Sequence, residues 1–540
     1  MEKAPETVQL NEEQFGALRE RLEKNQLTAE DRRLIVQIFQ AMRWLTQQLE
    51  LGRLSMHRLK RLIFGEKTES RENIFKGTEK GPNKSGSKCW TESSDENKPK
   101  KPGHGRRGAD EYTGAEKIFC PHPNLKAGSP CPDCGKGYLH AAVEKGIFIR
   151  FVGNPPISAT IYETEKLRCG LCGKVFEAPL PSDVKAERWD ESAKSVCALS
   201  RYGYGVPHYR LEKWQADLGV PVSDSVAFSL SNDVADCGFA VYRLLVQMGA
   251  QGSLIHYDDT GIKILDLIQE NKTRDPTKER VGMFTTAVIS ETSGKEIALF
   301  FSGRNHAGEN IVKLLEKRVA GLDPPLLMSD GSSRNPPTKE FEAILLNCLT
   351  HGRRHFVDLM ESFPQEIKYV IDTLALVYHN DALSKNMGAE QRLRFHQKNS
   401  GPLMDELKAW CRSQIENKKA EPNSGLGKAI KYMEKRWEKL TQFLKIPGAP
   451  LSNDIAERLI KRCVLHRKNS LFFWTEHGAA VGDILMSLIH TTVRTKENPF
   501  HYLTALQRHR SEVKQNPQAW LPWTYRATLK SLLPSHEKGI

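Results

Sequence analysis

The chain has 540 residues, with 79 lysines and arginines against 66 aspartates and glutamates and a formal net charge of +13. At about 150 residues per domain, this length predicts three to four domains. The sequence contains no apolar run near the ~18 residues that a membrane span requires, and its first ten residues (MEKAPETVQL) lack the apolar stretch of a secretory signal. We therefore expect a cytoplasmic protein without a membrane partner. The positive charge favours DNA or RNA as a partner, and 11 scattered cysteines favour a reducing compartment over a disulfide framework.

Residues 1–65 predict a helical, coiled-coil-like segment. Thr28 to Asp31 has the pattern of a capping box, and apolar residues then recur at helical spacing at Leu34, Ile38, Ala41 and Leu45. The segment either self-associates or packs on its own chain.

Residues 66–118 are rich in Lys, Gly, Ser, Pro and Glu, which predicts a basic flexible linker. Its basic cluster, which includes Arg106 and Arg107, is either a solvated charge run or an arm that contacts phosphates.

Two Cys-x-x-Cys-Gly motifs follow, formed by Cys131 with Cys134 and by Cys169 with Cys172. Two thiolates at this spacing in a tight turn bind half of a tetrahedral Zn²⁺ site, so we expect a zinc ribbon over residues 119–180 that holds one structural Zn²⁺. Strands predicted at 146–152 and 157–164 would form a long hairpin between the two motifs. The alternative is four buried thiols without a metal.

Residues 181–250 predict helices. An amphipathic run at 209–218 is broken by the Gly-Val-Pro of 219–221, and Ser223 can cap the next helix. The pattern suits a helix-turn-helix that binds DNA, and it equally suits a plain helical hairpin.

From residue 251 the pattern changes to strands. Residues 251–350 predict the first part of a catalytic core, in which three strands, one helix and a parallel strand follow one another, at 254–265, 281–290, 296–302, 308–319 and 326–330. This is the opening order of an RNase H-like sheet. Residues 338–444 have a helical pattern broken at 421–425, which predicts a helical insertion over 351–450. Residues 451–510 would return to the core through a helix that begins near Asn453, and residues 511–540 would form a C-terminal tail.

Three acidic residues stand out by position. Asp258 lies inside an apolar strand, Asp330 ends a buried strand, and Glu457 lies on a helix with basic residues along it. A carboxylate inside a strand is costly unless something pairs with it, and a divalent metal is one such partner. Taken singly, Asp330 could instead belong to a turn, and Glu457 could form a surface pair with Lys461.

Ordered motifs through most of the chain resemble those of DDE transposases of the insertion-sequence-66 (IS66) family. They comprise FG at 64–65, PGHGRR at 102–107, both cysteine motifs, segments at 202–211 and 218–221, HYDDT at 256–260, DG at 330–331, CLTH at 348–351 with RRHF at 353–356, NDIAER at 453–458, RKNSLF at 467–472 and PFHYL at 499–503. The resemblance implies a multidomain α/β fold with an RNase H-like mixed-sheet core and a large all-helical insertion, preceded by the N-terminal helix, the zinc ribbon and the helical DNA-binding segment.

For function, the resemblance implies a transposase that binds the ends of a bacterial insertion sequence and catalyses DNA cleavage and strand transfer. Asp258, Asp330 and Glu457 would be the catalytic triad and would hold two Mg²⁺ (or Mn²⁺) ions, since Mg²⁺ prefers hard oxygen ligands. Cys348 and His351 would support the site. The residues expected to bind DNA phosphates are Arg106, Arg107, Arg353, Arg354, Arg458, Lys461, Arg462, Arg467 and Lys468.

The sequence departs from the family pattern at three of these motifs. The aromatic positions usual after the second Asp are polar here, around Ser333 and Asn335, so we expect that loop to contact substrate differently. The family's Asp-Glu-Thr is Asp258-Asp259-Thr260 here, and strand alternation lets only one of the two acids face the site, for which the register favours Asp258. The family's Asp-Asn-Asn is Ser452-Asn453-Asp454 here. Asp454 therefore lies one helical turn before Glu457 and could substitute for it or assist it.

The expected partners are double-stranded DNA, as terminal inverted repeats and as target, a second or further copy of the chain, and accessory proteins of the same element. The expected location is the bacterial cytoplasm, with the protein on the nucleoid when it is bound to DNA. Two alternatives stay open: a metal-dependent nuclease on the same core that does not join strands, and a non-catalytic, domesticated protein that only binds DNA.

Overall fold

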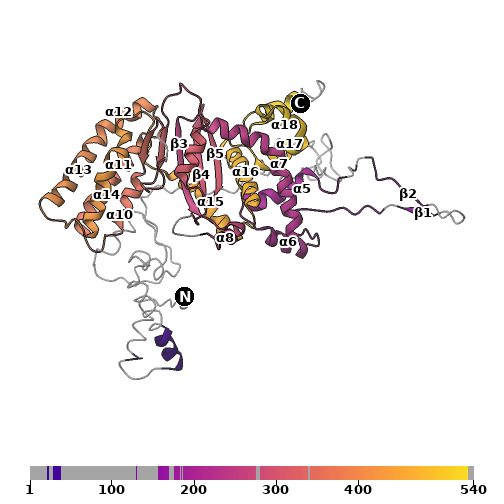
Figure 1. Ribbon diagram of the computed structural model, residues 1–540, viewed down its shortest axis with the longest axis horizontal. Helices are drawn as coiled ribbons and strands as arrows, with labels where there is room; N and C mark the ends of the chain where they lie inside the picture. The colour runs from indigo at the N-terminus through magenta and orange to yellow at the C-terminus, as the bar shows by residue number, and fades with distance from the viewer. Residues whose placement is uncertain are drawn as a thin grey trace. The chain divides into compact units, whose positions relative to one another are not determined.

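The computed structural model describes residues 21–22, 28–37, 129, 156–163, 165–168, 175–182, 184, 187–274, 280–337 and 341–532. The chain divides into two compact units, one formed by residues 1–80 with 163–540 and the other by residues 81–162. All the strands and helices named below belong to the first unit (Figure 1). Within the described ranges, no helix is both long enough and apolar enough to cross a bilayer.

A mixed five-stranded sheet forms the centre of this unit, in the order β5-β4-β3-β6-β7. β4 pairs antiparallel with both β3 and β5, whereas β6 runs parallel to β3 and β7 runs parallel to β6. The turn between β4 and β5 consists of Ser293 and Gly294, whose φ angles of 50° and 71° are the positive values that a two-residue hairpin turn requires. The five strands are β3 (Leu254–Gly261), β4 (Phe284–Thr292), β5 (Lys295–Gly303), β6 (Leu326–Ser329) and β7 (Ile344–Asn347).

This sheet with its many helices confirms the predicted multidomain α/β class. The three predicted strands, the helix α9 (Ala307–Leu315) and the parallel strand are present in the predicted order, but the short helix α8 (Leu265–Glu270), which was not predicted, lies between β3 and β4. One prediction here is wrong, because residues 344–347 fall in the stretch predicted to be helical and instead form β7. Four apolar residues fit a buried strand as well as one helical turn, so periodicity alone does not distinguish the two.

Two hydrophobic cores meet at the sheet. Leu327 belongs to a core shared with β3 to β5, α9, the helices that precede the sheet and those that follow the insertion. Leu326 and Met328 belong to a second core shared with the helical insertion. This division follows from strand alternation, which sends neighbouring side chains of β6 to opposite faces. The helices of the insertion are α10 (Leu349–Val357), α11 (Pro364–Leu383), α12 (Ala389–Asn399), α13 (Gly401–Glu416) and α14 (Gly425–Leu440), followed by the short turn η3 (Gln442–Leu444).

The helices before the sheet are α5 (Glu191–Ala198), the π-helical η2 (Leu199–Gly203), α6 (His208–Asp217) and α7 (Asp224–Gly249). The predicted break and cap between α6 and α7 are confirmed, since the Ser223 hydroxyl accepts a hydrogen bond from the Val226 N–H at 3.4 Å. α7 also contributes buried residues such as Val234, Val241 and Leu245 to the first core. It is therefore part of the structural core, and a helix-turn-helix role in DNA binding stays a prediction.

The described part of the predicted zinc ribbon contains one short hairpin. β1 (Lys166–Arg168) pairs antiparallel with β2 (Val175–Glu177), and the sequence between these strands contains Cys169 and Cys172. The strand predicted at 157–164 is wrong over the described residues 157–163, where Ile161 is 87% exposed and no neighbouring strand supplies ladder hydrogen bonds. The strand predicted at 146–152 and all four cysteines of the two motifs lie outside the described residues.

In the N-terminal segment, the structure describes residues 28–37 as the start of a helix. The predicted capping box is confirmed there. The Thr28 hydroxyl accepts from the Asp31 N–H at 3.1 Å, and the Asp31 carboxylate accepts from the Thr28 N–H at 3.0 Å. The predicted linker, with Arg106 and Arg107, lies outside the described residues.

The predicted C-terminal tail is wrong over residues 511–532. Trp520 and Tyr525 are each only 1% exposed, and the Tyr502 hydroxyl donates to the Trp520 carbonyl at 2.8 Å. These residues pack against α7 and α17 because their aromatic side chains complete the first core. The elements after the insertion are α15 (Asp454–Ser470), α16 (Glu476–Arg494), α17 (Pro499–Arg508), α18 (Arg510–Gln515), η4 (Pro517–Trp520) and α19 (Tyr525–Leu532).

Replacing Trp520 tests whether these C-terminal elements belong to the core. Because the side chain is fully buried, Trp520→Ala should lower the free energy of unfolding by about 3–5 kcal/mol, measured by urea denaturation. The matched control is Trp474→Ala, whose side chain is 71% exposed and whose loss should change stability by less than about 0.5 kcal/mol. Equal effects of the two substitutions would contradict the packing described here.

Candidate active site

Strand β3 divides its side chains between two sides of the sheet. Along one side, the His256 ring bonds to Asn453 at the start of α15, and the Thr260 hydroxyl accepts from Arg467 on α15 at 3.0 Å. Asp258 lies between these two residues and by alternation faces α15 with them. Asp259 faces the other way, and its carboxylate accepts from the Ala307 N–H at 3.2 Å, at the start of α9. Of the two neighbouring acids, Asp258 is therefore the one on the α15 side.

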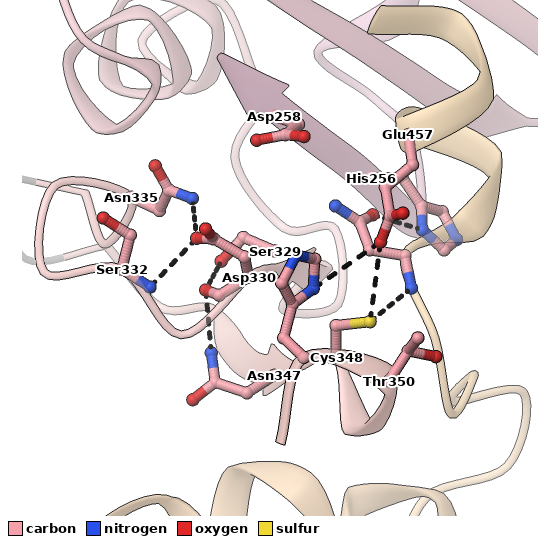
Figure 2. A network of polar contacts seen from close by, with 12 residues as sticks. His256, Asp258, Ser329, Asp330, Ser332, Asn335, Asn347, Cys348, Thr350 and Glu457 are labelled. Carbon is pink, nitrogen blue, oxygen red and sulfur yellow. Dashed lines mark hydrogen bonds and ion pairs between the residues drawn. The ribbon is translucent and has the colours of Figure 1, made fainter. Parts of the chain in front are cut away.

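Asp330 follows the last residue of β6, next to β3 in the sheet. Its carboxylate accepts hydrogen bonds from the Ser332 N–H at 2.9 Å and from the Asn335 side-chain amide (Figure 2). Because β3 and β6 are parallel, Asp330 leaves the sheet at the same edge toward which β3 carries Asp258. The turn at 330–335 thus fixes the direction of one carboxylate near the other.

The helical insertion fixes the same turn from the other side. Arg436 on α14 donates through Nε and Nη2 to the Gly331 carbonyl at 3.0 and 2.8 Å, and its guanidinium stacks on the Tyr432 ring with a centroid distance of 4.0 Å. A Cβ atom on Gly331 would come within 2.2 Å of the Tyr432 hydroxyl. A side chain directly after Asp330 would therefore have to displace the Tyr432 and Arg436 side chains that hold this turn.

Glu457 lies in the first turn of α15. Its Oε1 atom is 3.5 Å from Nδ1 of His351 and 3.9 Å from the thiol of Cys348, which immediately precedes α10. Asp454, one turn earlier on the same helix, is exposed, whereas Glu457 is half-buried. The two acids therefore differ in surroundings, and Glu457 is the one that lies against Cys348 and His351.

Asn453, at the start of α15, joins this helix to β3 and to the start of α10. It is completely buried; its backbone N–H donates to the Cys348 sulfur at 3.2 Å, and its side-chain amide donates to the Tyr257 carbonyl at 2.9 Å. The amide oxygen then accepts from Nδ1 of His256 at 3.0 Å. Burial lowers the pKa of His256 to about 4, so the ring is neutral near pH 7 and donates through Nδ1.

The charges of Asp330 and Glu457 act on the carboxylate of Asp258. The pKa of Asp258 is raised from 3.8 to about 7, first by burial and then by the negative charge of Asp330, with smaller contributions from Asp259 and Glu457. The Asp259 N–H, which donates to Asp258 at 2.8 Å, opposes this shift. Among the described residues, no lysine or arginine forms an ion pair with Asp258, Asp330 or Glu457. Carboxylates that leave the sheet at the same edge without a cationic partner suit a hard divalent cation such as Mg²⁺.

The family model "Transposase IS66 family" matches residues 187–481, more than half of the chain. The chain belongs to the IS66 transposase family. Two similar proteins, both from Sinorhizobium fredii, are the uncharacterized proteins y4jD and y4hP. The first is 25% identical over 386 residues, which cover 66% of this chain and 71% of that protein. The second is 23% identical over 386 residues and covers 67% of each.

Of the basic residues predicted to bind DNA, Arg106 and Arg107 lie outside the described residues, and the other seven fall into three groups in this transposase. Four are exposed along α15 and form what we call the α15 basic ridge: Arg458, Lys461, Arg462 and Lys468. Arg467 instead donates to Thr260 and to the Gly261 carbonyl, so it holds α15 against β3. Arg353 and Arg354 on α10 are half-buried and contact their neighbours.

Sequence reasoning missed the polar residues that hold the acids in place. Asn453 was noted only as part of a motif, and no role was predicted for His256, Asn335 or Arg436. The available signal was weak. An asparagine directly before an acidic helix suggests a helix cap, but its bonds to β3 and Cys348 depend on chain segments that are distant in sequence.

The raised pKa of Asp258 predicts a specific pH dependence of stability in metal-free buffer. Between the ordinary pKa of 3.8 and the folded value of about 7, the folded protein binds more protons than the unfolded chain, so this group's contribution to stability falls as pH rises. Asp258→Asn removes the repelled charge and should therefore stabilise the protein more at about pH 8 than at about pH 4, as measured by urea denaturation with EDTA present.

Asp259→Asn is the control for this measurement. It removes a carboxylate from the N-terminus of α9, where negative charge is favourable, so it should destabilise the protein. A pH-independent difference between wild type and Asp258→Asn would contradict the proposed repulsion. Burial also raises the pKa of Asp483 to about 7. Because Asp483 is present in both proteins, its effect cancels in the difference between their stabilities.

Proposed function

We propose that this transposase binds the ends of a bacterial insertion sequence and catalyses divalent-metal-dependent DNA cleavage and strand transfer through Asp258, Asp330 and Glu457. The observation that carries the proposal is the placement of these residues: β3 and β6 run parallel and direct Asp258 and Asp330 to the same edge of the sheet, and α15, which carries Glu457, contacts β3. Burial and then the negative charges of Asp330 and Glu457 raise the pKa of Asp258, in keeping with this placement. These residues come from β3, from the end of β6 and from α15. Acids so distant in sequence that act on one another at the edge of a sheet suit a shared metal site.

The sheet supports the same proposal. Its order, with three antiparallel strands followed by two parallel ones, is the arrangement that we expect of an RNase H-like core. The first acid then lies on the central strand, the second follows the adjacent parallel strand, and the third lies on a helix that contacts β3. Membership of a transposase family adds that divalent metal ions and DNA are the expected cofactor and partner.

Each residue has a role that its surroundings permit. Asp258, Asp330 and Glu457 would hold two Mg²⁺ ions, which when bound lower the pKa of the attacking hydroxyl and stabilise the leaving oxygen. Ser332 and Asn335 keep the Asp330 carboxylate oriented. The α15 basic ridge begins at the residue after Glu457 and is exposed, so its charges can hold DNA phosphates beside the acids. Bringing two element ends together would require at least two copies of the chain.

Asp258→Asn is the direct test of the catalytic assignment. The substitution keeps the size of the side chain but removes the negative charge, so cleavage of element ends in Mg²⁺ should fall by at least about 10³-fold, while DNA binding in a gel-shift assay should persist. Asp330→Asn and Glu457→Gln should behave in the same way. Cleavage by purified Asp258→Asn at the wild-type rate would refute the proposal.

Asp454→Asn is the matched control, because it removes a neighbouring carboxylate that is exposed on the same helix. It should retain most of the cleavage activity if Glu457 is the third acid, and a loss as large as that of Glu457→Gln would assign Asp454 to the site as well. A DNA substrate with a pre-cleaved 3′ end then separates the two enzyme classes. Joining of that end to a target supports a transposase, whereas cleavage without joining indicates a nuclease.

We also propose a structural zinc ribbon in which Cys131, Cys134, Cys169 and Cys172 bind one Zn²⁺. Its support is the motif spacing together with the pairing of β1 and β2 on either side of the second motif. Four thiolates form a closed tetrahedral site with a structural role.

Elemental analysis tests the ribbon. Protein purified without chelator should contain about one zinc per chain more than Cys169→Ser purified in the same way. Cys237→Ser is the matched control, because Cys237 is a buried cysteine in α7 outside both motifs. Wild-type protein without zinc would exclude the ribbon.

A further inference from the structure

Three different metal-binding side chains meet between α10 and α15. The Cys348 sulfur, Nδ1 of His351 and a carboxylate oxygen of Glu457 all lie within 4.8 Å of one another. Cys348 is buried, whereas His351 and Glu457 are half-buried with side-chain exposures of 23% and 22%, so the cluster has one closed and one accessible side. Figure 2 shows Cys348 and Glu457 directed toward each other at this point.

Ordinary packing leaves part of this arrangement unexplained. Nδ1 of His351 is buried and has no hydrogen-bond partner among the described residues, although it lies 3.5 Å from Glu457 Oε1. A buried ring nitrogen without a partner is unfavourable unless something else binds it. The Cys348 sulfur already accepts the Asn453 N–H at 3.2 Å, the type of contact that stabilises a metal-bound thiolate.

The donor set differs in chemistry from the cluster of Asp258 and Asp330. Sulfur and imidazole nitrogen are poor ligands for Mg²⁺ and good ligands for Zn²⁺ and Co²⁺. In a tetrahedral zinc site the ligand atoms lie within about 4 Å of one another, so the observed separations need only a small adjustment of side chains.

We propose that Cys348, His351 and Glu457 form a binding site for one thiophilic divalent cation such as Zn²⁺, separate from the zinc ribbon. On binding, the Cys348 thiol forms a bond from sulfur to the metal and releases its proton to solvent. Three protein ligands leave the fourth tetrahedral position to water.

Occupation of this site has a consequence that rests on the proposed function. Glu457 is also the third acid of the proposed triad, so an ion held by Cys348 and His351 withdraws its carboxylate from the Mg²⁺ ions. Zn²⁺ would then inhibit DNA cleavage by competing for one side chain. Binding itself requires neither DNA nor Mg²⁺, which allows the two ideas to be tested separately.

The binding test uses full-length protein purified without chelator, so that the ribbon keeps its own metal. Co²⁺ is added in the absence of DNA and Mg²⁺, and the near-ultraviolet absorption band from thiolate to cobalt is recorded together with the bound Co²⁺ per chain. Wild type should bind one more Co²⁺ per chain than Cys348→Ala. Of these two proteins, only wild type should show the additional absorption band. His351→Ala should weaken Co²⁺ binding by at least ~10-fold, since the loss of even an outer-shell partner commonly has this effect.

Cys411→Ala is the matched control, because Cys411 is a fully buried cysteine in α13 that does not belong to the group of Cys348, His351 and Glu457. It should bind Co²⁺ like wild type, and circular dichroism checks that each variant is folded. His351→Ala changes a half-buried side chain, so it keeps the test decisive even if Cys348→Ala is unstable. Equal Co²⁺ binding and equal absorption in wild type, Cys348→Ala and His351→Ala would overturn the site.

The inhibitory consequence is measured separately, as the Zn²⁺ concentration that halves Mg²⁺-dependent DNA cleavage relative to each protein's own rate. This concentration should be at least ~10-fold higher for His351→Ala than for wild type. An unchanged value would refute competition for Glu457. Absence of cleavage by wild type would instead refute the proposed function and leave the Co²⁺ result to decide the site.

Discussion

The position of the candidate active site depends on the buried side chain of Asn453. Its amide and backbone N–H make three hydrogen bonds, to β3 through Tyr257 and His256 and to the start of α10 through Cys348. A buried amide without these partners would be unfavourable, because its desolvation would not be compensated by hydrogen bonds. The three hydrogen bonds of Asn453 therefore stabilise the packing of α15 against β3 and the start of α10. Glu457 follows within one turn, and its distance from Asp258 is therefore set by this residue.

A second constraint comes from the helical insertion. Arg436 and Tyr432 on α14 enclose Gly331, and the insertion shares a core with β6 and β7. The insertion therefore supports the sheet edge and orients the turn that carries Asp330. Cys348 and His351, at the start of α10, connect the same insertion to Glu457. Residues that follow β7 therefore help to position both Asp330 and Glu457, the two acids outside β3.

The sequence predicted the elements whose patterns are local. Strands with long apolar alternation, the cap at Ser223 and the helix that begins after Asn453 required only neighbouring residues. The four residues of β7 and the helices around Trp520 were missed because their burial depends on distant partners. Alternation along β3 also predicted that Asp258 and Asp259 point to opposite sides of the sheet, as they do in the structure. By contrast, the bonds of Asn453 and Arg436, like the approach of His351 to Glu457, arise only when segments more than 100 residues apart meet.

The packing of the last helices against α7 has a consequence for protein synthesis. α7 is translated well before α18, η4 and α19, yet these last elements cover part of its surface. The first core therefore closes only after the segment up to about residue 530 has left the ribosome, and a polypeptide that stops before α18 would keep this apolar surface of α7 exposed.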